Sequence, residues 1–120
     1  MSDLYTKIFV RTPGSRADLL GHVRTALGGE VDGWTLLADN VEVDVDTNDD
    51  ASSPPEKVAE LDAFLYFPLT VEVVGVGGRI ELEQYLKRVG SLMTYLHDRG
   101  MSVVAACDWE DQLPSGGRLR

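Results

Sequence analysis

The first half of the chain alternates between apolar and polar residues over two stretches, which predicts extended segments. Residues 5–11 (YTKIFVR) place Tyr5 and Phe9 on one face of a strand and the even-numbered residues on the other. Residues 33–46 (GWTLLADNVEVDVD) alternate as well, but their apolar positions change from even to odd numbers midway. Such a change requires a bulge or a tight turn, and the Asp-Asn pair at 39–40 is the expected place for it.

Two further apolar stretches predict strands in the second half. Residues 63–76 (AFLYFPLTVEVVGV) form a long β run. Within it Pro68 marks an edge, a bulge or a strand start, because proline cannot donate to a β-ladder. Residues 101–107 (MSVVAAC) predict the final strand, and residues 108–120 are expected to form a turn and a loose tail.

Two segments repeat their apolar residues at helical spacing. The first begins at Ser15, a typical N-cap with Asp18 three residues later, and ends at the glycine pair 28–29. The second covers residues 80–99, where one face carries a leucine-rich stripe, and Gly100 ends it.

The predicted order of elements is therefore βαββαβ. This order is typical of a ferredoxin-like α+β fold, in which two helices cover one face of an antiparallel four-stranded sheet. A chain of 120 residues has the size of one domain. We expect a single α+β domain over residues 1–114 and a flexible C-terminal tail over residues 115–120. In this fold the strand that ends at residue 46 lies at an edge, and one sheet face stays uncovered.

The net charge of −9 comes entirely from the middle of the chain. Residues 31–62 contain ten acidic residues and one lysine, whereas the segments before and after them have net charges of +1 and −1. Such an acidic field repels nucleic acid and anionic membranes and attracts basic proteins or cations. We therefore expect a basic protein partner, and neither a nucleic acid nor a membrane.

The acidic residues concentrate in the segment VEVDVD and the loop after it, where the valines face one way and the carboxylates the other. The candidate partner-binding residues of this region are Glu42, Asp44, Asp46, Asp49 and Asp50. The alternative interpretation is that these charges only protect an edge strand from pairing with another chain, and supply the polar outer face that a half-buried alternating strand needs.

A calcium loop is a third interpretation, since Asp44, Asp46 and Asn48 match its first, third and fifth ligand positions. The match then ends, because Asp49 stands in place of the required glycine and Pro55 in place of the bidentate glutamate. We predict no metal site and no cofactor.

Aromatic residues supply the candidate apolar contacts. If Ile8 and Val10 face the helices, Tyr5 and Phe9 point outward on the uncovered sheet face and could bind a partner or a second copy of the chain. The alternatives are that the faces are reversed or that the long middle loop covers these rings. Trp109, in the acidic segment after the last strand, is a further candidate anchor, or part of a solvated turn.

No catalytic constellation is predicted. His22 and His97 lie in different predicted helices without a ligand-spaced partner, and Cys107 ends an apolar run, where a buried thiol is the default. The sequence therefore favours a non-enzymatic binding protein. The alternative is a ferredoxin-like homodimer that binds a small molecule, or acts as a small enzyme, on its open sheet face.

The chain resembles small stand-alone proteins of high-GC Gram-positive bacteria in its Gly, Ala, Val and Asp content and its eight Arg to three Lys. The segments FLYFPLTVEV at 64–73 and AACDWEDQLP at 105–114 resemble parts of small proteins encoded beside polymorphic toxins and regarded as immunity proteins. This resemblance implies a protein that neutralises a basic toxin domain by binding it, without catalytic residues. The N-terminal residues lack a secretory signal pattern, so we expect a cytoplasmic protein.

Overall fold

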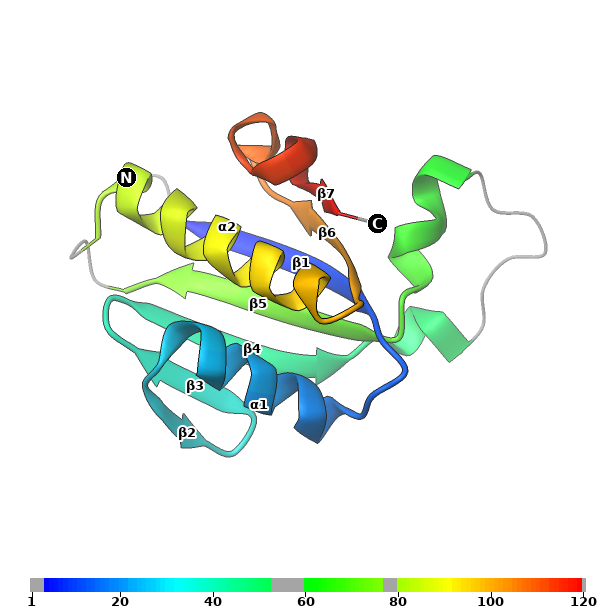
Figure 1. The fold of residues 1–120 in the computed structure, drawn as a ribbon, viewed down its shortest axis with the longest axis horizontal. Coiled ribbons are helices and arrows are strands. Elements are labelled where there is room, and N and C mark those ends of the chain that lie inside the picture. The colour runs from blue at the N-terminus through cyan, green and yellow to red at the C-terminus, as the bar shows by residue number, and fades with distance from the viewer. Residues whose placement is uncertain (1–3, 53–59, 77–79, 120) are drawn as a thin grey trace.

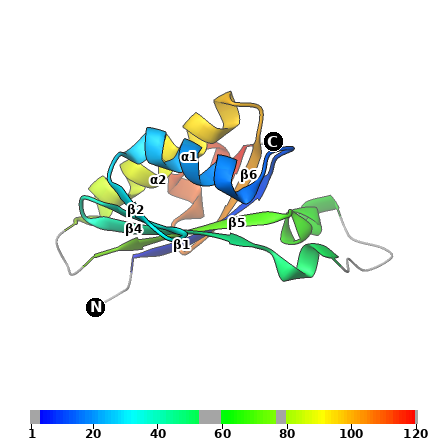
Figure 2. The same ribbon diagram turned by 90° about the horizontal axis from the view of Figure 1, so that it is seen from below.

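In the part of the chain that the structure describes, one antiparallel β-sheet and two α-helices make up the fold, and both helices pack on the same face of the sheet (Figure 1, Figure 2). The computed structural model describes residues 4–52, 60–76 and 80–119, with only the backbone at 50, 52 and 60–62. In chain order the strands and α-helices are β1 (Tyr5–Arg11), α1 (Arg16–Leu27), β2 (Glu30–Asp32), β3 (Thr35–Ala38), β4 (Val41–Thr47), β5 (Leu69–Gly75), α2 (Leu82–Asp98), β6 (Ser102–Ala106) and β7 (Arg118–Leu119). The described connections contain the 3₁₀ helices η1 (Asp49–Ser52), η2 (Glu60–Tyr66), η3 (Glu110–Gln112) and η4 (Pro114–Gly117).

The strand order corrects the predicted sheet. Within the described residues the order is β2-β3-β4-β5-β1-β6-β7, and every neighbouring pair is antiparallel. The α+β class is confirmed, but the prediction of a four-stranded sheet is wrong, because the described chain forms seven strands. The acid-bearing strand β4 is therefore not an edge strand, since β3 pairs with its outer side and β2 pairs with β3.

The change of parity within 33–46 is a β-hairpin. Ala38 pairs with Val41, so Asp39 and Asn40 form a two-residue turn between β3 and β4. Asn40 has a φ of 66°, a left-handed conformation that asparagine tolerates. The tight turn expected at this place is confirmed.

The long β run expected over 63–76 divides at Pro68. Strand β5 begins at Leu69, directly after the proline, which confirms Pro68 as the place where the strand starts, but residues 63–66 belong to η2. The prediction of strand for 63–67 is wrong. The run AFLYF has no alternation, and apolar periodicity cannot separate a strand from a buried helical turn in so short a segment.

The core lies between the sheet and the helices. The first helix begins as predicted, with a capping box in which the Asp18 N–H donates to Ser15 Oγ (3.1 Å) and the Ser15 N–H donates to Asp18 Oδ2 (3.0 Å). The hydrogen bond from the Ser15 N–H, and after it the Ser15 side chain, lower the pKa of the Asp18 carboxyl below its usual value. The fully buried side chains of the core include Ile8, Val10, Leu19, Val23, Leu36, Val43, Val45, Val71, Leu92, Met93 and Leu96.

A tyrosine hydroxyl joins the helix layer to the centre of the sheet. Tyr85 of α2 is fully buried, and its hydroxyl donates to the Val73 carbonyl oxygen at 2.7 Å. Since its single proton is used there, the Thr6 hydroxyl, 2.7 Å away, donates to the Tyr85 oxygen. Burial, which outweighs the opposing effect of the Thr6 hydrogen bond, raises the pKa of Tyr85 to about 12.

The C-terminal residues carry more structure than the expected turn and tail. They form η3, η4 and β7, and β7 pairs with β6 through Val103 opposite Leu119 and Val104 opposite Arg118. Leu113 is buried among them and contributes to the core. A strand of two residues is too short to show an alternation of apolar and polar positions. The sequence therefore does not predict β7, and only its pairing with β6 in the folded chain shows it.

Candidate functional site

Figure 2 shows both α-helices on one face of the sheet, and we call the opposite face the open face. The strand register places most of the candidate residues on this open face. Cross-strand partners share a sheet face, so the strand register assigns residues to it. One row across five strands, which we call the tyrosine row, consists of Glu30, Leu37, Glu42, Val74 and Tyr5. The neighbouring row, the lysine row, consists of Asp32, Thr35, Asp44, Glu72 and Lys7.

A third row shows that part of this face is covered. It runs through Asp46, Thr70, Phe9 and Val104. Phe9 points to this face as predicted, but it is only 7% exposed, because the Phe64 ring of η2 meets it edge-on with ring centroids 5.2 Å apart. The prediction of Phe9 as an exposed partner contact is therefore corrected: Phe64 covers it, from a segment that was predicted as strand and forms η2.

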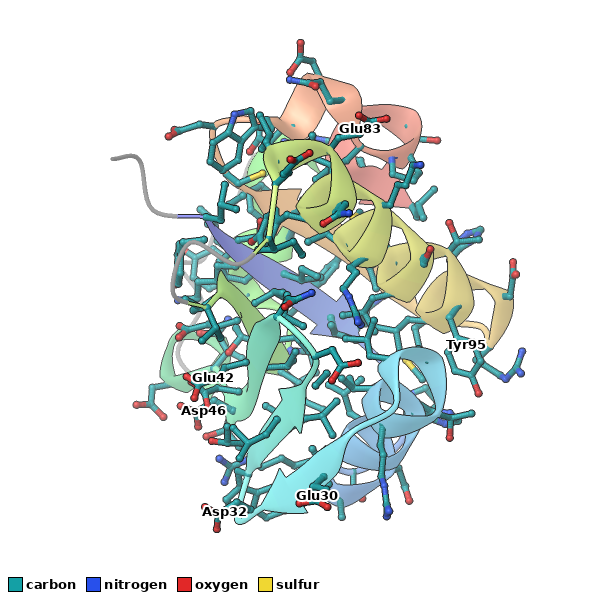
Figure 3. All side chains as sticks on the ribbon, turned by 90° about the vertical axis from the view of Figure 1, so that its left-hand side faces the viewer. Glu30, Asp32, Glu42, Asp46, Glu83 and Tyr95 are labelled. Atoms are coloured by element: carbon teal, nitrogen blue, oxygen red, sulfur yellow. The ribbon has the colours of Figure 1, made fainter. Side chains whose placement is uncertain are left out.

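Acidic and basic side chains lie at different ends of the open face. The carboxylates of β2, β4 and β5 form what we call the acidic half: Glu30, Asp32, Glu42, Asp44, Asp46 and Glu72. All are exposed except the half-buried Glu72. Figure 3 shows Glu42 and Asp46 on the side of the sheet that faces away from the helices. The cations gather at the other end of the sheet, where Lys7 lies over the Phe9 ring (5.3 Å) and Arg118 over the Phe64 ring (4.9 Å).

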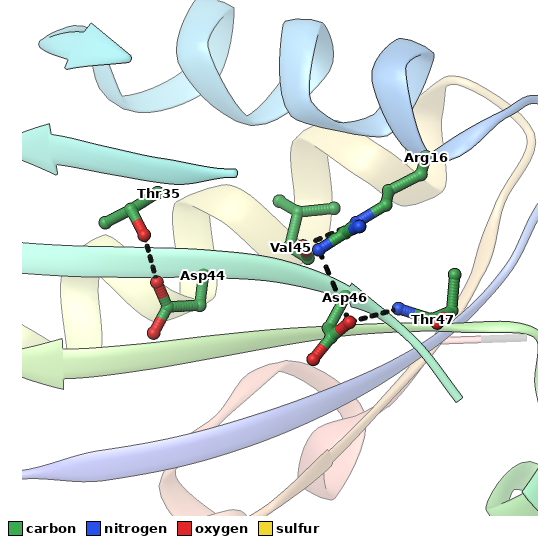
Figure 4. A network of polar contacts seen from close by, with 6 residues as sticks. All are labelled: Arg16, Thr35, Asp44, Val45, Asp46 and Thr47. Carbon is green, nitrogen blue, oxygen red and sulfur yellow. Dashed lines mark hydrogen bonds and ion pairs between the residues drawn. The ribbon is translucent and has the colours of Figure 1, made fainter. Parts of the chain in front are cut away.

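Two aspartates of β4 differ in how far their charge is neutralised (Figure 4). Asp44 accepts a hydrogen bond from the neutral Thr35 hydroxyl. Asp46 forms an ion pair with Arg16 of α1, with Nη2 and Oδ1 3.3 Å apart. The same guanidinium donates from Nε to the Val45 carbonyl oxygen at 2.9 Å, which fixes it at the end of β4. The structure therefore offsets the charge of Asp46 more than that of Asp44.

Tyr5 lies on the open face, with 41% of its surface exposed, and confirms the predicted orientation of its strand. Its hydroxyl hydrogen-bonds to the Glu72 carboxylate one strand away. Partial burial, then the charge and the hydrogen bond of Glu72, raise the pKa of Tyr5 above the usual tyrosine value. The phenol thus stays protonated at neutral pH and donates to the carboxylate.

Two of the candidate residues, Asp49 and Trp109, lie apart from this face. Asp49 is exposed in η1, beyond the end of β4, and the side chain of Asp50 lies outside the described part of the chain. Trp109 is half-buried and packs edge-on against Tyr85 of α2, with ring centroids 6.4 Å apart. Trp109 is therefore packed with the helix layer, and the structure does not bring it together with Tyr5.

The residues that matched a calcium loop do not converge. The Asn48 amide donates to the carbonyl oxygens of Leu65 and Phe67, both at 2.8 Å, while Asp44 and Asp46 bind Thr35 and Arg16. Among the described residues, no group of three or more His, Cys, Asp or Glu side chains could hold a metal ion.

A groove of about 960 Å³ lies on the opposite side of the molecule. It runs along the outer face of α2 beside η4, and Glu83 and Tyr95 mark two points on its wall in Figure 3. Pro114 closes against the helix at Gly90, where a Cβ atom would lie 3.3 Å from the proline Cδ. Its lining is mixed and combines apolar residues with charged ones such as Glu83, Lys87 and Asp98.

Three of the six residues of the acidic half were not predicted from the sequence. Glu30 and Asp32 belong to the unpredicted strand β2, and Glu72 was read only as part of an apolar run. The alternation of Thr70, Glu72 and Val74 with buried valines was the one signal that could have placed Glu72 on the open face.

None of the described helices has the length and apolar character needed to cross a membrane. No family model matches the chain, and neither does a curated protein or a solved structure.

Proposed function

We propose that this protein is a non-enzymatic binding domain that receives a basic protein partner on the acidic half of the open sheet face. A basic toxin domain neutralised by this protein would be a partner of that kind. The order β4-β5-β1-β6 of the four central strands supports a ferredoxin-like core, extended by the β2-β3 hairpin and by β7.

The observation that carries the proposal is the position of β4 inside the sheet. Edge protection is the ordinary reason for charged residues on a strand, but β4 is paired on both sides. Asp44 also lies directly opposite Glu72, an arrangement of like charges that destabilises a sheet. Charges that do not protect an edge and that repel one another are explained by a basic partner, which relieves the repulsion.

A charge-matched comparison tests this proposal. The variant Glu42→Gln/Asp44→Asn/Asp46→Asn removes three charges from the open face. The control Glu81→Gln/Glu83→Gln/Asp98→Asn removes three exposed charges from around α2 on the other side of the sheet. Binding of a fluorescent twelve-residue Lys/Arg peptide is measured by anisotropy between low and physiological salt, and thermal unfolding checks that both variants fold.

We expect the β4 variant to lose at least tenfold in affinity at low salt and to show a flatter salt dependence, because charge pairs across an interface weaken with screening. The control should bind within threefold of the wild type. Equal losses in both variants would mean that only net charge matters, and the proposal would be wrong.

The alternative, a homodimer formed through the open face, has less support. Of the two aromatic residues that would have joined two copies, Phe9 is covered by Phe64 and only Tyr5 remains exposed. A face-to-face pair centred on the acidic half would also bring like charges together. Sedimentation equilibrium at physiological salt distinguishes a monomer from such a dimer.

A further inference from the structure

Apolar side chains lie among the carboxylates of the acidic half. Leu37 and Tyr5 are 44% and 41% exposed, and both belong to the tyrosine row. Val74 lies in the same row, directly opposite Tyr5, and is half-buried. Single exposed apolar residues are ordinary on a protein surface, but these three lie on one face within one row.

The spacing of the row gives the size of this apolar strip. Strands in a sheet lie about 4.8 Å apart, so the three intervals from Leu37 to Tyr5 span roughly 14 Å. Glu42 interrupts the strip within the row, and Glu30 closes its outer end. The next row on the same face lies about 7 Å away and places Asp32, Asp44 and Glu72 alongside it.

We propose, as a refinement that rests on the proposed function, that the partner places a large apolar or aromatic side chain on the strip of Leu37, Val74 and Tyr5. Lysine or arginine side chains around this anchor then reach the surrounding carboxylates. An apolar centre within a polar rim is the usual anatomy of a specific interface. In such an interface the charges set the rate of association, while the apolar centre holds the complex.

Charge complementarity makes the occupant a different, basic chain. In a symmetric dimer with its twofold axis at the strip, each copy would present Glu42, Asp44 and Glu72 to the same residues of the other. That contact would bury like charges against one another. The free energy cost of this burial exceeds the gain from burying the small apolar strip. A basic partner, in contrast, can place an apolar side chain on the strip and its cations beside the surrounding carboxylates.

Two peptides of equal charge test the anchor. The first is a twelve-residue Lys/Arg peptide with a central Trp-Leu pair, and the second carries Ser-Ser at the same place. We expect the Trp-Leu peptide to bind the wild-type protein at least tenfold more tightly at physiological salt. The double variant Leu37→Ser/Tyr5→Ser should reduce this preference to less than threefold. Both side chains are well exposed, so the variant is expected to fold, and thermal unfolding verifies it.

A matched control uses Leu82→Ser, because Leu82 is 37% exposed but lies on α2 beside the groove. This variant should keep the tenfold preference. If the preference survives in the Leu37/Tyr5 variant, or is lost with Leu82→Ser, the anchor does not lie on the tyrosine row. If sedimentation shows a wild-type dimer that Leu37→Ser dissociates, the occupant is a second copy, and the inference is overturned.

The same experiment separates this inference from the proposed function. Equal affinity for the two peptides, together with loss of binding in the Glu42/Asp44/Asp46 variant, would refute the apolar anchor and leave the acidic docking face standing. Failure of the wild type to bind either peptide would refute both.

Discussion

Replacing Tyr85 by phenylalanine removes one oxygen atom from the centre of the fold. The Tyr85 hydroxyl donates to the Val73 carbonyl and accepts from Thr6, so its loss leaves two buried polar groups without this partner. A buried group that loses its hydrogen bond costs about 1–3 kcal/mol. We therefore expect Tyr85→Phe to lower the free energy of unfolding by about 2 kcal/mol, which corresponds to a melting temperature about 8 °C lower.

A double-mutant cycle isolates the network. Thr6→Val removes one hydrogen bond but leaves the Tyr85 hydroxyl donating to Val73, so it should cost only about 1 kcal/mol. Once Tyr85 is phenylalanine, the Thr6 hydroxyl is already unsatisfied, and its replacement by valine should cost little further. The expected coupling energy is about 1 kcal/mol in urea unfolding followed by circular dichroism. Tyr95→Phe, on the outer face of the same helix, is the control and should change stability by less than about 0.5 kcal/mol.

The raised pKa of Tyr85 adds a dependence on pH with a definite sign. Between the ordinary tyrosine pKa and about 12, the unfolded chain has released this proton while the folded chain keeps it. Stability from this group is thus complete below about pH 10 and is lost as pH rises toward 12, by about 1.4 kcal/mol per unit. The difference in free energy of unfolding between wild type and Tyr85→Phe should therefore become smaller above pH 10. The buried network would be refuted if the stability losses of Tyr85→Phe and Thr6→Val added up in the double variant. It would also be refuted if the difference in free energy of unfolding between wild type and Tyr85→Phe stayed constant up to pH 12.

Three further predictions concern α1 and its two ends. Ser15→Ala should cost about 1 kcal/mol in urea unfolding by removing the N-cap. It should also reduce the acid sensitivity due to Asp18, whose lowered pKa contributes stability that is lost as pH falls through the folded-state value. Gly29→Ala should be strongly destabilising in thermal melts, because φ is +104° and a Cβ would lie 2.4 Å from the Leu37 carbonyl oxygen. Gly21→Ala, with nothing within 4 Å of the new Cβ, should instead stabilise α1 by up to about 1 kcal/mol.

The sequence by itself determined what depends on near neighbours in the chain. The capping box at Ser15 and Asp18, the limits of β1 and the turn at Asn40 follow from local hydrogen bonding, alternation and backbone conformation, and all were predictable. The faces of β1 were predictable for the same reason, because alternation in a strand does not depend on what pairs with it.

Tertiary pairing decided the candidate site. Strands β2 and β7 are too short for any periodicity, and they exist because β3 and β6 offer them partners. Their pairing at one side moves β4 from an edge to the interior of the sheet, and register across strands brings Glu72 and Tyr5 to the acidic residues. Whether Phe9 is exposed depends on Phe64, which is 55 positions away along the chain. Such contacts join segments distant in sequence, so no pattern within one segment can encode them, and only the folded chain shows which side chains share a surface.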